Sequence, residues 1–305
     1  MQRGFKTMTT GTEHAEALKG RRLAVLGCGV MGEAIIASLL KGELVSTAQI
    51  RGAEPADWRR NELANRYDLE LTDDNAQAIE NADVVLLTVK PQSLDDVFAD
   101  LRGRLRDDQV VVSIAAGATL GRLLRGLGHP AIVRAMPNTP SQIGQGMTVW
   151  MATEDVTDEQ GEMVAAVLSA MGKAVRVHDE NEVDMATALS GTGPAYIFLM
   201  MEALIDAGVH LGFSRHIAEE LVLQTILGSV LFARDSGLHP AELRNMVTSP
   251  GGTTANALYH MEKGGLRTVM ARAVWAAYER TIQLGAGDKT PTAPREIGRS
   301  DSLDD

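Results

Sequence analysis

The stretch that decides the fold lies at residues 22–32 and has the sequence Arg22-Leu23-Ala24-Val25-Leu26-Gly27-Cys28-Gly29-Val30-Met31-Gly32. An apolar run of strand type ends in Gly-x-Gly-x-x-Gly, and helix-forming residues follow from Glu33 to Lys41. The first glycine allows a tight turn, the second lets a pyrophosphate approach the backbone, and the third lets helix and strand pack closely. The helix start adds unpaired N–H groups. An isolated glycine pattern also occurs in ordinary turns, but the strand before it and the helix after it predict a dinucleotide site. Its expected residues are Gly27, Cys28, Gly29, Val30, Met31 and Gly32.

Outward from this stretch, apolar strand-like runs alternate with helical patterns as far as His178. This alternation predicts an α/β fold of the Rossmann type, a doubly wound and mostly parallel sheet with helices on both faces. A capping-box sequence at Thr157-Asp158-Glu159-Gln160 begins one of the helices, which we expect to end near Gly172. The expected strands lie at residues 23–26, 49–53, 84–89, 110–114, 131–135, 147–151 and 174–177.

After His178 the strand signals stop, and long helical patterns continue to Leu284. Helices expected over 194–211 and 215–235 are apolar on nearly every side, which in a domain of about a hundred residues indicates subunit association. We therefore predict a dinucleotide-binding domain over residues 21–178 and an all-α substrate and dimerisation domain over residues 179–285. The segments 1–20 and 286–305 show no sustained periodicity, and we expect both to be disordered.

The composition of the 305 residues limits the classes of partner. A formal net charge of -11 disfavours nucleic acid and anionic membranes, so small-molecule ligands are expected. The single cysteine excludes an intrachain disulfide and a Cys-rich zinc site, and the histidines lack metal-binding spacing, so no metal is expected. We expect no apolar run to approach the length needed to span a bilayer, and the N-terminus lacks the apolar core of a secretion signal. We predict a cytoplasmic protein with no membrane contact.

The end of the second expected strand bears on the choice of coenzyme. Glu54 lies about 20 residues beyond the glycine stretch, where an acidic side chain accepts from a free ribose 2′-hydroxyl and favours NAD. Arg51, Arg59 and Arg60 favour the 2′-phosphate of NADP. For Arg59 and Arg60 the alternative is a solvated helix face. The sequence leaves NADH and NADPH as alternatives.

Three further strands end in residues suited to a ligand crevice, which open parallel sheets form at the carboxyl ends of their strands. Thr88-Val89-Lys90-Pro91 ends one strand, residues 113–117 end the next, and residues 134–140 end a third. Ala115 and Ala116 are small enough to admit a nicotinamide ring, and prolines stiffen the turns. Each stretch taken alone is also typical of ordinary strand-to-loop connections.

A second anion-binding turn is expected between Pro240 and Glu262. The turn Val247-Thr248-Ser249-Pro250-Gly251-Gly252 ends one helical pattern, and the next pattern begins at Thr253 and Thr254. Free backbone N–H groups and the short hydroxyls can bind an anion there. The alternative is a helix N-terminus capped by Ser or Thr, with no ligand.

The order of these motifs resembles that of the pyrroline-5-carboxylate reductases, from about Arg22 to Leu284. The stretch from Pro240 to Glu262 agrees with the family signature throughout. Four other stretches also match: Val89-Lys90-Pro91, Arg134-Ala135-Met136-Pro137-Asn138-Thr139-Pro140, Ser190-Gly191-Thr192-Gly193-Pro194-Ala195-Tyr196 and Asp206-Ala207-Gly208-Val209. Two positions depart from the pattern. Val30 stands where the family more often has Asn, and Glu54 stands where some members have small polar residues around the 2′-phosphate.

The resemblance implies NADPH- or NADH-dependent reduction of the cyclic imine 1-pyrroline-5-carboxylate to L-proline, the last step of proline biosynthesis. It implies that Thr254 hydrogen bonds to the ring nitrogen as the residue nearest to a catalytic role, and that Asn75 approaches the adenine ribose. It also implies homo-oligomers, namely dimers with interwoven helical domains that often stack into decamers. It assigns the substrate carboxylate to five residues: Ser249, Gly251, Gly252, Thr253 and Thr254.

Three carboxylates, Glu180, Glu182 and Asp184, precede the helical part of the chain. Their position predicts solvated charges at a helix start, whereas the resemblance places Glu180 near the ligands.

Two other functions are compatible with a glycine loop followed by a helical domain. A 3-hydroxyacid or 6-phosphogluconate-type dehydrogenase needs a lysine on a helix of the second domain, but the chain has none between His178 and Lys263. A non-catalytic dinucleotide-sensing protein would bind the coenzyme without turnover.

Overall fold

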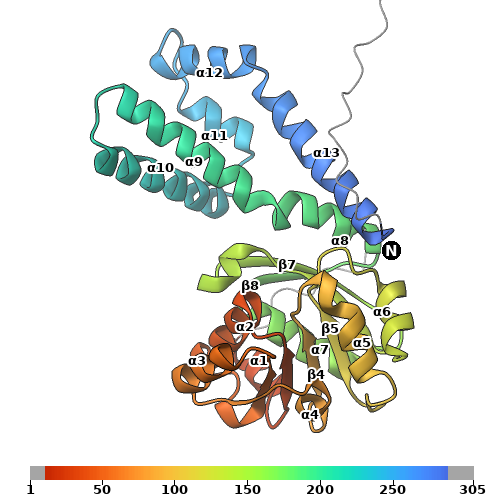
Figure 1. Ribbon diagram of the computed structural model, residues 1–305. Helices are drawn as coiled ribbons and strands as arrows, with labels where there is room; N and C mark the ends of the chain where they lie inside the picture. The colour runs from red at the N-terminus through yellow and green to blue at the C-terminus, as the bar shows by residue number, and fades with distance from the viewer. Residues whose placement is uncertain (1–10, 288–305) are drawn as a thin grey trace, which may run out of the picture. The chain divides into compact units, whose positions relative to one another are not determined.

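The structure is a computed structural model that describes residues 11–287 (Figure 1). The described chain divides into two compact units, one made of residues 11–192 and 277–287 and the other of Gly193–Ala276. The first unit contains one eight-stranded sheet with its helices, and the second contains helices only. The predicted fold class, a Rossmann-type α/β sheet followed by an all-α part, is confirmed.

The sheet has the strand order β3-β2-β1-β4-β5-β6-β7-β8. Neighbouring strands are parallel except β6 and β7, which are antiparallel. The strands are β1 (Leu23–Leu26), β2 (Ile50–Ala53), β3 (Glu70–Thr72), β4 (Val84–Leu87), β5 (Val110–Ser113), β6 (Ile132–Met136), β7 (Gly146–Ala152) and β8 (Gly172–Arg176). The seven predicted strands are all present, with bounds shifted by up to two residues. The sequence analysis missed β3, because this short edge strand has no fully buried residue to give an apolar signal.

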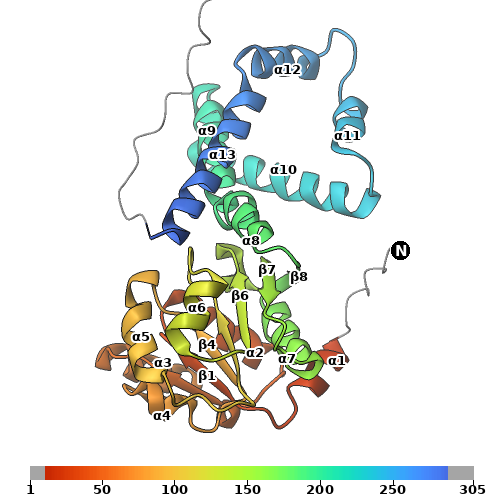
Figure 2. The same ribbon diagram turned by 90° about the vertical axis from the view of Figure 1, so that its right-hand side faces the viewer.

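Helices cover both faces of the sheet, as the two views in Figures 1 and 2 show. One face packs against α1 (Gly11–Ala17), α2 (Val30–Lys41), α3 (Asp57–Tyr67) and α7 (Asp158–Ser169), and the other against α4 (Asn75–Ile79), α5 (Leu94–Leu101) and α6 (Leu120–Leu127). Leu23 and Val25 of β1 join the first core cluster, whereas Ala24 and Leu26 join the second. This alternation follows from the two-residue period of a strand and fixes both layers of helices.

The predicted capping box at the start of α7 is present. The Gln160 N–H donates to Thr157 Oγ1 at 3.2 Å, and the Thr157 N–H donates to Gln160 Oε1 at 3.0 Å. At the other end of the unit, the prediction of disorder over 1–20 is wrong for residues 11–17, which form α1, and Leu18 after it is fully buried. Residues 1–10 and 288–305 lie outside the described residues.

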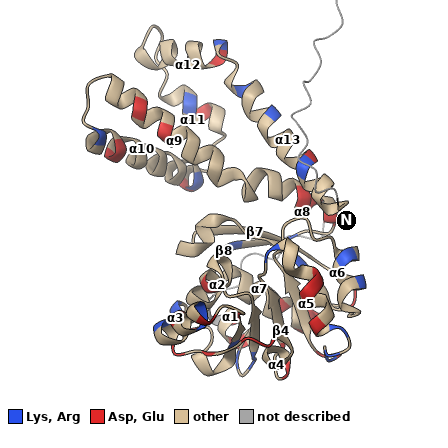
Figure 3. Cartoon of the chain, in the orientation of Figure 1, with Lys and Arg blue, Asp and Glu red and all other residues tan. Residues whose placement is uncertain are grey.

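The second unit contains α9 (Gly193–His210), α10 (Arg215–Ser236), α11 (Pro240–Met246), α12 (Thr253–Lys263) and the first part of α13 (Leu266–Gly285). The two predicted long helices correspond to α9 and α10. In these two fully described helices Ala218 is the only buried residue, and apolar side chains such as Leu199 are up to two-thirds exposed. Figure 3 shows few charged residues along them. Residues 11–287 therefore leave a large apolar surface on α9 and α10 uncovered.

The prediction that no apolar run approaches membrane-spanning length is wrong. The helical run Glu180–His210 and α10 are both long and apolar enough to cross a membrane. Helices of this length and composition occur as membrane spans and also as core helices of soluble proteins.

Candidate functional site

The glycine turn after β1 needs two of its glycines for packing and leaves the third open. Gly27 has φ 89°, and a Cβ there would lie 2.7 Å from Val89 Cγ1. A Cβ on Gly32 would lie 2.5 Å from the carbonyl oxygen of Gly27, whereas a Cβ on Gly29 would meet nothing within 4 Å. The turn therefore has open space at Gly29, the position where a pyrophosphate approaches the backbone in dinucleotide folds.

The N-terminus of α2 lies directly beside this open space. Its first intrahelical hydrogen bond runs from the Glu33 N–H to the Gly29 carbonyl at 2.9 Å, and no side chain caps the helix. The N–H groups of Val30, Met31 and Gly32 precede that bond, so they remain as donors for an anion. The Val30 side chain is 62% exposed. The Val at this position, where the reductases that the sequence resembles more often have Asn, therefore has no effect on the core.

The strand order places the glycine turn at the topological switch point of the sheet. The chain leaves β1 for β2 and β3 on one side and returns at β4 on the other. Thr88, directly after β4, donates from Oγ1 to the carbonyls of Leu26 at 2.9 Å and Gly27 at 2.6 Å. Since β1, β4 and β5 are parallel neighbours, residues 88–91 and Ala115-Ala116 lie on the same edge as the turn. Open α/β sheets bind ligands at such an edge.

Two of the predicted residues, Glu54 and Asn75, follow the strands β2 and β3, at the part of this edge where dinucleotide folds hold the adenine ribose. We call this part the ribose end. Glu54 is the first residue after β2, and its Oε1 accepts from the Ala56 N–H at 3.2 Å. Asn75 begins α4, and its Nδ2 donates to Asp100 Oδ2 at 2.9 Å. Both follow the carboxyl ends of their strands. The topology therefore places them on the same edge of the sheet as the glycine turn.

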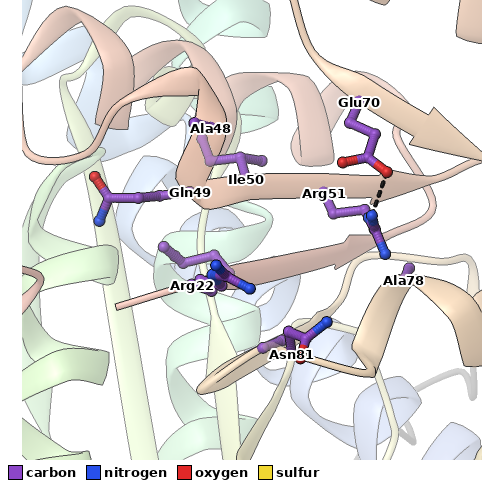
Figure 4. A pocket seen from close by; sticks show the side chains of 10 residues that line it. Arg22, Ala48, Gln49, Ile50, Arg51, Glu70, Ala78 and Asn81 are labelled. Carbon is purple, nitrogen blue, oxygen red and sulfur yellow. Dashed lines mark hydrogen bonds and ion pairs between the residues drawn. The ribbon is translucent and has the colours of Figure 1, made fainter. Parts of the chain in front are cut away.

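Arg51 does not lie at the ribose end. It lines a pocket at the opposite, amino-terminal edge of the sheet, together with Arg22, Gln49 and Asn81 (Figure 4). Its guanidinium pairs with Glu70 and donates to the Gln77 carbonyl at 3.2 Å. The prediction that Arg51 can pair with a ribose phosphate is therefore wrong, because the side chain is committed at the other end of the strand.

Cys28 is fully buried beneath the turn, with Sγ 3.5 Å from the Val25 carbonyl oxygen. Burial first, and then the negative charge of Glu54, raise the pKa of the thiol to about 12, although the positive charge of Arg59 opposes the rise. The predicted structural role of this side chain agrees with its position.

We expect native Cys28 to react with a disulfide reagent at pH 8 at least about 100-fold more slowly than the unfolded chain does. A pKa of about 12 leaves roughly one thiol in 10⁴ ionised at that pH, and the thiolate is the reactive form. The sequence contains one cysteine, so the released chromophore reports on Cys28 alone. Equal rates with and without guanidinium would contradict the buried position.

A buried ion-pair network lies in the middle of β6. Arg134 is 3% exposed, and it donates from Nη1 to Glu180 Oε1 at 2.8 Å and from Nη2 to Asp184 Oδ1 at 2.5 Å. Glu180 also accepts from the Leu120 N–H at 2.7 Å. The prediction of solvated charges is wrong for Glu180 and Asp184, which instead attach α8 (Glu180–Ala186) to the sheet. An arginine inside an apolar strand is the sequence signal that could have indicated this, because a buried cation requires partners.

Two stretches that carry the family resemblance and are distant in the sequence lie side by side at the same strand end. Asn138 Nδ2 donates to the Ser190 carbonyl and hydroxyl oxygens, both at 3.3 Å, and a Cβ on Gly191 would lie 2.8 Å from Met136 Cε. Asn138 Oδ1 also accepts from the Met147 N–H at 2.9 Å. The sequence analysis did not connect these two stretches.

The late turn in the second unit has the geometry of an uncapped helix start. Gly251 has φ 68°, and Gly252 occupies the N-cap position of α12 with no side-chain cap. The first hydrogen bond of the helix runs from the Asn256 N–H to the Gly252 carbonyl at 3.2 Å. The alternative of a Ser- or Thr-capped helix is therefore wrong. The N–H groups of Thr253, Thr254 and Ala255 remain as donors.

Comparison with known proteins places the chain in a family. A family model described as pyrroline-5-carboxylate reductase dimerisation matches residues 180–284, and one described as NADP oxidoreductase, coenzyme F420-dependent, matches residues 22–117. The pyrroline-5-carboxylate reductase of Synechocystis sp. is 43% identical over 264 residues, which cover 87% of this chain and 98% of that protein. The chain belongs to the pyrroline-5-carboxylate reductase family. The Pseudomonas aeruginosa pyrroline-5-carboxylate reductase is 41% identical, with 86% of this chain and 96% of that protein covered.

Solved structures of pyrroline-5-carboxylate reductases have the same fold over nearly the whole described chain. The Coxiella burnetii structure matches with a TM-score of 0.81 at 36% identity, covering 87% of this chain and 98% of that one. The Plasmodium falciparum structure, which has NADP bound, matches with a TM-score of 0.80 at 31% identity and the same coverage. This pyrroline-5-carboxylate reductase family member is an oxidoreductase with a pyridine nucleotide coenzyme. The match over 180–284 identifies its exposed apolar helices as a dimerisation domain.

Proposed function

We propose that the chain catalyses the reduction of 1-pyrroline-5-carboxylate to L-proline with NADH or NADPH, the last step of proline biosynthesis. The observation that carries this proposal is the 43% identity to a pyrroline-5-carboxylate reductase, which extends over both units. The proposal also accounts for the two uncapped helix starts, one in each unit. One suits the coenzyme pyrophosphate and the other suits the substrate carboxylate.

The first unit supplies the coenzyme residues in this proposal. The open space at Gly29 and the free donors at the start of α2 fit a pyrophosphate. Thr88 steadies the turn through its two hydrogen bonds. When bound, the reduced nicotinamide supplies the hydride for the C=N carbon. The residues proposed to hold the coenzyme are Gly27, Cys28, Gly29, Val30, Met31, Gly32, Glu54, Asn75, Thr88, Val89, Lys90, Pro91, Ala115 and Ala116.

The second unit supplies the substrate residues. Backbone N–H groups and hydroxyls from Ser249 to Thr254 are proposed to hold the carboxylate, with Gly251 and Gly252 letting the backbone approach closely. The Thr254 hydroxyl is proposed to hydrogen bond to the ring nitrogen. These groups orient the imine and stabilise charge during its reduction, which is the protein's share of the chemistry.

The assembly and location form a second part of the proposal. We place the functional domains at residues 21–178 and 179–285 and propose a cytoplasmic homodimer with interwoven helical domains, with decamers as a further level. The uncovered apolar side chains of α9 and α10 support self-association, and the net charge of -11 disfavours nucleic acid and anionic membranes. Light scattering on the purified protein should give at least twice the 32.7 kDa chain mass without detergent. A monomer, or a detergent requirement, would contradict this part.

The catalytic proposal is tested by nicotinamide oxidation at 340 nm with purified protein and pyrroline-5-carboxylate. We expect turnover with at least one coenzyme and formation of L-proline in equal amount, identified by chromatography. Coenzyme binding without turnover would contradict the proposed reaction and favour a dinucleotide-sensing protein.

A further inference from the structure

All three nitrogens of the Arg59 guanidinium group, at the ribose end of the sheet edge, donate hydrogen bonds to other partners. Its Nη1 donates to Glu62 Oε2 at 2.7 Å, its Nη2 to Glu33 Oε2 at 2.5 Å, and its Nε to the Cys28 carbonyl at 3.0 Å. The side chain is only 12% exposed. Burial works to lower the pKa of Arg59, but the hydrogen bonds with Glu33 and Glu62 raise it overall. Arg59 therefore links α2, α3 and the glycine turn through hydrogen bonds.

Arg60 is committed in the same way. Its Nη1 donates to the carbonyls of Glu54 at 2.6 Å and Pro55 at 2.8 Å, so it holds the connection between β2 and α3. Its Nη2 pairs with Asp57 and lies 3.9 Å from Asp73 Oδ2. The charge of Arg60 is thus balanced by two carboxylates, one at the start of α3 and one in the connection between β3 and α4.

In contrast to the two arginines, Glu54 has a side chain with few hydrogen-bond partners. It follows β2 directly, and the Gly27 N–H donates to the carbonyl of Ala53 at 2.8 Å, so Glu54 is next to the residue that joins the strand to the turn. Within the described residues, the only hydrogen bond of its carboxylate is the one that Oε1 accepts from the Ala56 N–H at 3.2 Å. In dinucleotide folds, a carboxylate at this place accepts from the ribose 2′-hydroxyl.

We propose that the chain prefers NADH to NADPH, with Glu54 as the residue that determines this specificity. The proposal rests on the proposed function only in taking the ligand to be a nicotinamide dinucleotide. A 2′-hydroxyl can donate to the Glu54 carboxylate, whereas a 2′-phosphate adds negative charge beside Glu54, Asp57 and Asp73. Arg59 can neutralise that phosphate only by leaving Glu33 without this partner, which is costly because the two side chains are only 12% and 18% exposed. Arg60 can turn to the phosphate only by giving up the hydrogen bonds of its Nη1 to the carbonyls of Glu54 and Pro55.

Direct binding of the two dinucleotides tests the proposal without catalysis. Titration of the full-length protein with NADH and NADPH, followed by nucleotide fluorescence, should give a Kd for NADH at least about tenfold lower. Glu54→Ser should weaken NADH binding by about tenfold, because a charge-assisted hydrogen bond is worth about 1.5 to 3 kcal/mol and 1.4 kcal/mol is tenfold. The same variant should strengthen NADPH binding, and added salt should narrow the preference of the unmodified protein, since charge repulsion is screened.

Glu70→Gln is the matched control. It removes a carboxylate from the amino-terminal edge of the sheet, where Glu70 pairs with Arg51, and it should leave the ratio of the two dissociation constants unchanged. Equal or tighter NADPH binding by the unmodified protein, or an unchanged ratio in Glu54→Ser, would overturn the proposal. Failure of both dinucleotides to bind would overturn it together with the proposed function. Preferential NADH binding without reduction of pyrroline-5-carboxylate would support the specificity and contradict the reaction alone.

Discussion

Arg134→Met is expected to lower the free energy of unfolding by about 3 kcal/mol. The substitution keeps a long side chain in β6 but removes a cation that is 3% exposed and leaves two carboxylates without their partner. Breaking a buried ion pair costs about 3 to 5 kcal/mol. We expect the lower end because Glu180 is 32% exposed and keeps its hydrogen bond from the Leu120 N–H. Urea unfolding at one fixed protein concentration measures the change, since self-association affects apparent stability.

Arg122→Met is the control for this prediction. Arg122 pairs with Asp95 on the surface at 2.8 Å, with exposed fractions of 34% and 75%, so its loss should cost less than about 1 kcal/mol. Arg134→Lys should fall between the two variants, because one ammonium replaces two nitrogens that each bind a different carboxylate. If Arg134→Met and Arg122→Met lowered the free energy of unfolding equally, the buried ion pairs of Arg134 would stabilise the fold no more than the surface ion pair of Arg122 does.

The sheet could be predicted from the sequence because its signals are local. The apolar run of β1 and the glycine turn are continuous in the chain, and Gly27 and Gly32 are needed by contacts within that same connection or with the neighbouring strand end. Strand β3 was missed since its stability comes from pairing with β2 rather than from its own apolar pattern. The role of Arg134 was missed for a related reason. Its partners lie 46 and 50 residues away along the chain.

The sequence predicted which strand ends form the candidate site, but it did not predict how the charged side chains pair there. Parallel topology brings residues 88–91 and 115–116 to the edge of the glycine turn, whatever the side chains do. By contrast, Arg51, Arg59 and Arg60 look equivalent in the sequence. The structure distinguishes them, because Arg51 pairs at the opposite edge while Arg59 and Arg60 are held by acids from α2, α3 and the β3–α4 connection. Whether an arginine is available to a ligand depends on which carboxylate it already pairs with in the fold, and the composition of the sequence does not reveal that partner.

Thr254→Val is expected to lower kcat/KM for pyrroline-5-carboxylate by about 10²-fold, the size of effect seen when one hydrogen-bond donor to a reacting group is removed. Thr254 is the second residue of α12, and its hydroxyl is not used to cap the helix, so the substitution removes a polar contact while keeping the branched shape. Coenzyme Kd and thermal stability should remain unchanged, which separates this role from a structural one. Thr254→Ser should restore most of the rate.

Thr268→Val in α13 supplies the same chemical change at an exposed position outside the late turn, and it should leave kcat/KM unaltered. A fall in kcat with unchanged KM would indicate a contact to the ring nitrogen that strengthens as the imine is reduced. A rise in KM alone would instead place the Thr254 hydroxyl on the substrate carboxylate, with the rest of the turn. Full activity in Thr254→Val would show that the N–H donors at the start of α12 are sufficient without this hydroxyl.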